Sequence, residues 1–188
     1  MRSDNLYSLP KDLPVPLDDG AADHLRGMRI PSIQLLSTQD EWIDVSTQTT
    51  QFVILFCYPR TGLPDQEPPK GWNQIPGARG CTPECIGFHR FYEPLHDLGC
   101  AVFGLSTQRT EYQKEMADRL DLPFAVLSDH ALAFTKALRL PTFLVDGEEL
   151  LKRLTLVIRG GMIDHVFYPV FPPDRHAEEV LDWLKANA

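Results

Sequence analysis

The chain has 188 residues, of which 43% are hydrophobic and 23% are charged, as in an ordinary globular protein. This length fits a single compact core. The net charge of −8 argues against nucleic acid or an anionic membrane as a partner, because both repel an acidic protein. A membrane-spanning helix needs about 20 consecutive apolar residues, and no apolar run in this sequence approaches that length. The first residues lack the basic and apolar stretches of a secretory signal, so we expect a cytoplasmic protein.

The N-terminal third predicts an arm and the start of a sheet. Residues 1–30 are punctuated by Pro and Asp and predict an arm that wraps the surface or stays mobile, ahead of one domain over 31–188. Residues 33–45 predict a β-hairpin around the turn STQD. The run QFVILFCY (51–58) is continuously apolar up to Pro59, which is typical of a central strand buried on both faces.

A long insertion follows this strand. Residues 62–80 are dense in Pro and Gly, and loops of this length inside a compact domain are usually functional or disordered. We expect the loop to cover a functional site and Trp72 to anchor it. An apolar lid and an oligomer contact look alike in sequence, so both remain open.

The second half of the chain alternates predicted helices and strands. Apolar residues at helical spacing predict a helix over 82–98, kinked by Pro94 and stopped at Gly99. CAVFGLST (100–107) predicts a strand, and Thr110 with Gln113 matches a capping box for the next helix. FAVLSD (124–129) predicts a third strand and 130–138 a short helix.

The C-terminal part predicts a hairpin and a last helix. LLKRLTLVI (150–158) and MIDHVFYPV (162–170) flank a turn at 159–161. Asp174 is expected to cap the final helix, whose core-facing residues are Ala177, Val180, Leu181 and Leu184. The order of elements predicts an α/β fold with a mixed central sheet flanked by helices.

Cysteine thiol chemistry is the only catalytic chemistry that the sequence motifs indicate. Cys81 follows Gly80 at the expected start of a helix, where free N–H groups and the helix dipole favour a thiolate. Cys85 lies one turn further, and side chains at this spacing are too far apart for a disulfide while the helix is intact. The spacing therefore predicts a redox pair that closes only when the first turn unwinds.

These residues stand in a stretch that resembles a known family. FCYPR, GARGCTPECIGFHRFYEPLHDLGCAVFGLST and the later KRLTLVI are similar to peroxiredoxins of the bacterioferritin-comigratory or Q type, over about residues 27 to 188. The resemblance implies a thioredoxin-like fold and a thiol peroxidase without a bound cofactor. It further implies hydrogen peroxide or an alkyl hydroperoxide as substrate, a thioredoxin-like reductant, and a monomer or homodimer.

The resemblance assigns roles to four residues. Cys81 matches the peroxidatic cysteine, and Arg153 matches the active-site arginine that holds the thiolate and orients the peroxide. Cys85 matches the resolving cysteine and would form a Cys81–Cys85 disulfide, although the family cysteine lies one residue further along. Thr61 is the nearest counterpart of the family's threonine, with Thr82 or a water molecule as the alternative, because the long loop splits that motif.

The remaining cysteines have simpler interpretations. Cys57 and Cys100 lie in buried strand patterns and are expected to behave as small hydrophobic residues. Cys100 begins its strand and stays an outside candidate for the resolving role. Pro59 is expected to support the packing of the site.

Three other functions compete with the peroxidase. Cys81, Cys85 and His89 at helical spacing resemble the metal site of copper-handling Sco proteins, with His165 on a neighbouring strand. A redox sensor or partner-binding module of the same fold is the second alternative. A thioredoxin-like oxidoreductase needs C-x-x-C, which is absent. The other histidines are expected to be surface residues: His24, His96, His130 and His176.

Overall fold

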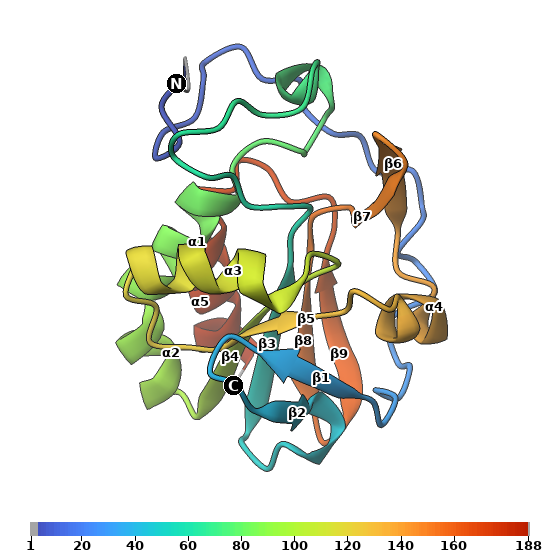
Figure 1. The fold of residues 1–188 in the computed structure, drawn as a ribbon. Coiled ribbons are helices and arrows are strands. Elements are labelled where there is room, and N and C mark those ends of the chain that lie inside the picture. Colours follow the sequence, from blue (N-terminus) through green and yellow to red (C-terminus); the bar gives the residue numbers. More distant parts are fainter. Residues whose placement is uncertain (1–3, 188) are drawn as a thin grey trace.

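The computed structural model describes residues 4–187 as a mixed seven-stranded sheet covered on both faces (Figure 1). The strand order is β2-β1-β5-β4-β3-β8-β9, with β3, β4 and β5 parallel and the other pairs antiparallel. The strands are β1 (Gln34–Ser37), β2 (Trp42–Asp44), β3 (Phe52–Cys57), β4 (Cys100–Ser106), β5 (Val126–Ser128), β8 (Leu154–Arg159) and β9 (Met162–Phe167). The predicted mixed α/β architecture is confirmed.

Five helices and a small second sheet complete the described part of the chain. The helices are α1 (Cys81–Arg90), α2 (Tyr92–Asp97), α3 (Thr110–Arg119), α4 (Ala133–Leu138) and α5 (His176–Asn187), with 3₁₀ turns at Val45–Thr47 and Trp72–Gln74. The small sheet pairs β6 (Thr142–Val145) with β7 (Glu148–Leu151). No helix among residues 4–187 is long and apolar enough to cross a membrane.

The central strand β3 divides the core in two, because its side chains alternate between the faces of the sheet. Phe52, Ile54, Phe56 and Tyr58 pack with apolar residues of α1, α2, α3 and α5. The intervening residues, from Val53 to Cys57, pack against α4, β1 and the N-terminal arm. All of β3 is buried, as the sequence predicted. Cys81 therefore packs on the face of β3 that is covered by α1, α2, α3 and α5, which we call the helix face.

The N-terminal arm, described from residue 4 to residue 30, contains no helix or strand. It runs from the end of the molecule that carries the 62–80 loop down the side occupied by α4 (Figure 1). Ala22, Leu25 and Ile30 enter the core on the α4 face, and Leu6 is buried at the other end of the arm. The second half of the arm therefore acts as part of the core.

The predicted helix over 82–98 is two helices. It breaks at Phe91, whose backbone (φ −100°, ψ 11°) is no longer helical. Pro94 explains the break, because it has no N–H to donate to the carbonyl of Arg90 and its ring clashes with that carbonyl.

The capping box was a wrong prediction. Helix α3 does begin at Thr110, but Arg109 is its N-cap and no side chain caps it. The Gln113 side chain is instead fully buried and donates hydrogen bonds from Nε2 to the carbonyls of Ser106 and Leu127.

The predicted continuous strand over 150–158 was also wrong. The chain forms β7, leaves it at Leu151, and starts β8 at Leu154. Asp146 and Gly147, with φ of 52° and 82°, turn β6 back into β7 and draw that segment away from the main sheet. Lys152 and Arg153 occupy the connection. The hairpin of β8 and β9 and the buried face of α5 are confirmed.

Candidate active site

Cys81 is the first residue of α1 and is buried. Gly80 precedes it with φ 114°, and a Cβ there would lie 2.4 Å from Cγ of Pro173 and 2.9 Å from Cδ2 of Leu9, so only glycine fits. The first N–H groups of the helix have no acceptor within it. The Cys81 side chain has 4% of its surface exposed. A small nucleophile is therefore held at an electropositive helix start with little solvent around it.

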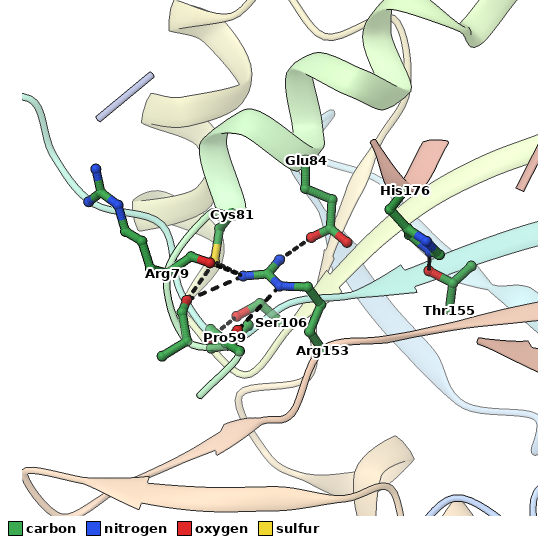
Figure 2. A network of polar contacts seen from close by, with 10 residues as sticks. Pro59, Arg79, Cys81, Glu84, Ser106, Arg153, Thr155 and His176 are labelled. Carbon is green, nitrogen blue, oxygen red and sulfur yellow. Dashed lines mark hydrogen bonds and ion pairs between the residues drawn. The ribbon is translucent and has the colours of Figure 1, made fainter. Parts of the chain in front are cut away.

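Arg153 reaches this sulfur from the connection between β7 and β8. Its Nη2 donates a hydrogen bond to Sγ of Cys81 at 3.2 Å, and the residue is only 3% exposed (Figure 2). The guanidinium also donates to the carbonyls of Gly77 and Ala78, at 3.3 and 3.2 Å. The end of the 62–80 loop therefore holds the guanidinium in place with its backbone.

Glu84 binds the other side of the same guanidinium. Its Oε2 accepts a hydrogen bond from Nη1 of Arg153, and Figure 2 shows the guanidinium lying between Cys81 and Glu84. The carboxyl is fully buried, and this burial raises its pKa despite the opposing charges of Arg153 and His176. Sequence reasoning missed Glu84. The available signal was an acidic residue three positions after Cys81, on the same face of the helix.

Cys85 lies one turn into α1 and has no exposed surface. It packs in the same core cluster as Tyr58 and Phe88. Burial, together with the nearby charges of Glu84 and Cys81, raises the pKa of the Cys85 thiol well above its usual value. All four cysteines are free thiols, so the structure represents the reduced protein with α1 intact.

Comparison with known proteins agrees with this geometry. The Redoxin family model matches residues 25–181. The chain belongs to the Redoxin family. The chloroplastic peroxiredoxin Q of Sedum lineare is 26% identical over 162 residues, covering 86% of this chain and 78% of that protein. Its counterpart from Arabidopsis thaliana is 26% identical, with 86% and 67% covered.

Solved structures show the same fold. Peroxidoxin BcpB from Mycobacterium tuberculosis superposes with a TM-score of 0.71 at 22% identity, covering 87% of this chain and 97% of that one. Peroxiredoxin Q from Xanthomonas campestris gives 0.66 at 18% identity, with 94% and 99% covered. The predicted resemblance to Q-type peroxiredoxins, the thioredoxin-like fold and the function class of thiol peroxidase are confirmed.

Two threonines lie near the Cys81 site. The hydroxyls of Thr61 and Thr82 are both buried without a hydrogen-bond partner among the described residues. Thr82 lines the small cavity beside Cys81, together with Arg60 and Gly62. Thr61 lines the neighbouring cavity under the loop, and its backbone N–H donates to Gln108 Oε1 at 2.7 Å. A substrate in the first cavity would therefore meet Thr82 before Thr61.

Cys57 and Cys100 lie away from the Redoxin site. Cys57 packs on the opposite face of β3 from Cys81, and Cys100 lies at the far end of β4, beside Phe52. The length of β4, about 20 Å, separates Cys100 from the strand end at Ser106. There Ser106 donates a hydrogen bond to the carbonyl of Pro59, which is buried below the site (Figure 2). The sheet therefore separates Cys57 from Cys81, and the length of β4 separates Cys100 from the end of the sheet at the site.

The 62–80 loop turns its Trp72 inward. Trp72 is 5% exposed and packs with Ala78, Val145 and Leu150, its ring 6.3 Å from that of Phe143. Trp72 therefore packs the loop against the small β6–β7 sheet.

The metal alternative finds no support in the described part of the chain. No three His, Cys, Asp or Glu side chains among residues 4–187 are grouped to hold a metal ion. His89 is exposed, and the ring of His165 stacks on that of Trp183. The expectation for His176 was wrong: it is 1% exposed, and its Nε2 lies 2.8 Å from Thr155 Oγ1.

Proposed function

We propose that this chain is a thioredoxin-dependent peroxidase in which Cys81 is the peroxidatic cysteine and Cys85 the resolving cysteine. The observation that carries the proposal is the buried hydrogen bond from Arg153 to the Cys81 sulfur. A guanidinium beside a sulfur at a helix start favours the thiolate, which is the form that attacks. The same fork of donors can bind the oxygens of a peroxide.

The first chemical step is a substitution at oxygen. The Cys81 thiolate attacks the terminal oxygen of a hydroperoxide, the O–O bond breaks, and the sulfur becomes a sulfenic acid. The alkoxide or hydroxide takes a proton and leaves as alcohol or water. Arg153 stabilises the negative charge that moves from sulfur to the leaving oxygen. Glu84 touches no substrate in this scheme and positions the guanidinium.

The second step requires α1 to open. Cys81 and Cys85 are four positions apart on an intact helix, too far for an S–S bond. Unwinding of the first turn lets the Cys85 sulfur attack the sulfenic acid, forming the disulfide and releasing water. A thioredoxin-like dithiol then reduces the disulfide by exchange, and two thiols are restored.

The proposal also covers the compartment, the oligomeric state and the partners of the protein. A reducing compartment such as the cytoplasm suits a chain with four free thiols. A monomer or homodimer is proposed, without nucleic acid or a membrane as partner. Analytical ultracentrifugation of the reduced and the oxidised protein tests the oligomeric state.

The decisive experiment is a thiol count with intact mass after one equivalent of hydrogen peroxide. The reduced wild type should lose two thiols rapidly, and Cys81→Ser should lose none. Cys85→Ser should accumulate a sulfenic acid that a dimedone probe traps, while Cys100→Ser should behave as wild type. A Cys85→Ser variant that turns over with thioredoxin at the wild-type rate would show that Cys85 is not the resolving thiol.

A further inference from the structure

The first described residues form a strap over the site. Residues 4–9, which we call the strap, run across the start of α1 with alternating exposure: Leu6 is 7% exposed, while its neighbours Asn5 and Tyr7 face solvent. Leu6 lines the cavity beside Cys81. One leucine of the arm is thus inserted next to the reactive sulfur.

Two arginines hold the strap in place. Arg79, two residues before Cys81 and 4% exposed, forms an ion pair with Asp4 at 2.8 Å and donates to the carbonyls of Asn5 and Ser8. Arg119 of α3 donates from Nη1 to the Tyr7 hydroxyl at 3.1 Å. The strap is therefore tied to the active-site loop and to a neighbouring helix by polar contacts that water can replace.

The strap leaves little room at the sulfur. The cavity lined by Leu6, Arg60 and Cys81 has a volume of about 20 Å³. A space of roughly 10–15 Å³ on this measure holds one water molecule. An alkyl or aryl group has no place beside Cys81 while Leu6 lies there.

We propose that the strap is a size filter for the peroxide, with Leu6 as the specificity-determining residue and Arg79 as the residue that positions it. This inference rests on the proposed function. Hydrogen peroxide, which consists of two oxygens and their hydrogens, enters with small adjustments of the cavity. A bulky organic hydroperoxide reacts only after Leu6 has left its pocket. This displacement breaks the apolar contacts between the Leu6 side chain and the rest of the protein.

The first test compares two peroxides across four proteins: wild type, Leu6→Ala, Asp4→Asn and Asp12→Asn. The measured quantity is the ratio of kcat/KM for hydrogen peroxide to kcat/KM for cumene hydroperoxide. Leu6→Ala should lower this ratio by about tenfold, because the freed volume removes the cost of displacing a buried leucine. Asp4→Asn should lower it less, since it loosens the strap without removing Leu6. Asp12→Asn is the matched control, because Asp12 belongs to the same arm and is exposed.

A second readout does not depend on peroxidase activity. Alkylation of Cys81 is followed by peptide mass spectrometry with a small reagent, iodoacetamide, and a bulky one, fluorescein maleimide. Leu6→Ala should accelerate the bulky reagent far more than the small one. The filter is overturned if all four proteins show the same peroxide ratio and the same preference between the reagents. Selective alkylation in a chain without peroxidase activity would keep the filter and refute the proposed function.

Discussion

Arg153 donates a hydrogen bond from Nη2 to the sulfur of Cys81 at 3.2 Å, and the two residues are 72 positions apart in the sequence. The contact exists because the chain leaves β7 two residues before β8 begins. The guanidinium is enclosed on its other sides by carbonyls of the 62–80 loop and by Glu84. The positive charge beside the sulfur is thus one that the fold itself buries.

Replacing Arg153 should slow the first step. Arg153→Lys keeps a charge but loses the planar fork, and Arg153→Met loses both, so we expect the oxidation of Cys81 to slow by about 100-fold or more in the second variant. Single-turnover trapping of the sulfenic acid in a Cys85→Ser background measures this rate. Arg90→Lys, an exposed change on the same helix as Cys81, is the control. An Arg153→Met protein that oxidises at the control rate would remove Arg153 from the mechanism.

Glu84 should matter for stability as well as for position. Glu84→Gln leaves Arg153 buried without its carboxylate partner, and removing one member of a buried pair costs about 3–5 kcal/mol in the free energy of unfolding. Urea denaturation of the reduced protein at pH 7 measures the loss. Glu93→Gln on α2 is exposed and should change stability by less than about 0.5 kcal/mol. Equal midpoints for the two variants would mean that the Glu84 pair contributes nothing.

The buried thiols should make stability fall at alkaline pH. Complete burial raises the pKa of Cys57, with smaller contributions from the charges of Glu84 and Asp129. The unfolded chain loses this proton near its ordinary pKa while the native state keeps it, so the stabilisation is complete below that pKa and is lost as pH rises above it. Each such group lowers the free energy of unfolding by about 1.4 kcal/mol per pH unit in that range.

Cys57→Ala isolates this effect. The unfolding free energy of this variant, measured by urea titration between pH 8 and pH 10, should fall less steeply with pH than that of wild type. The difference in slope should correspond to the one proton that Cys57 releases on unfolding. A shallow cavity also lowers its stability at every pH, so the slope and not the absolute value is diagnostic. Identical slopes would contradict the raised pKa of Cys57.

Oxidation should unwind the start of α1 while the rest stays folded. A disulfide between Cys81 and Cys85 is incompatible with the helical geometry of the first turn. Hydrogen exchange by mass spectrometry should therefore show faster exchange over residues 81–86 in the oxidised protein. The peptide that contains Phe88, which is fully buried and stacks on Phe56, should stay protected. An unchanged pattern after complete disulfide formation would exclude this route.

The sequence predicted the parts of the site that are local or that repeat a family pattern. Cys81 could be placed because a glycine and a helix start leave a mark in neighbouring residues. The contact of Glu84 with Arg153 was missed, because it depends on where the connection between β7 and β8 places Arg153. The strap was missed for a similar reason: residues 4–9 show no clear periodicity, and the contact that places Asn5 comes from Arg79, 74 positions away.

Strand β3 separates the four thiols into two groups, with Cys81, Cys85 and Cys100 in the core cluster on one face and Cys57 in the cluster on the other. Under the proposed function, oxidation that begins at Cys81 should therefore spare Cys57 across the sheet and Cys100 at the far end of β4. A sample titrated with excess thiol reagent after denaturation should retain two reactive groups however many catalytic cycles it has completed. The thiols of Cys57 and Cys100 can therefore serve as an internal reference when the oxidised thiols of a sample are counted.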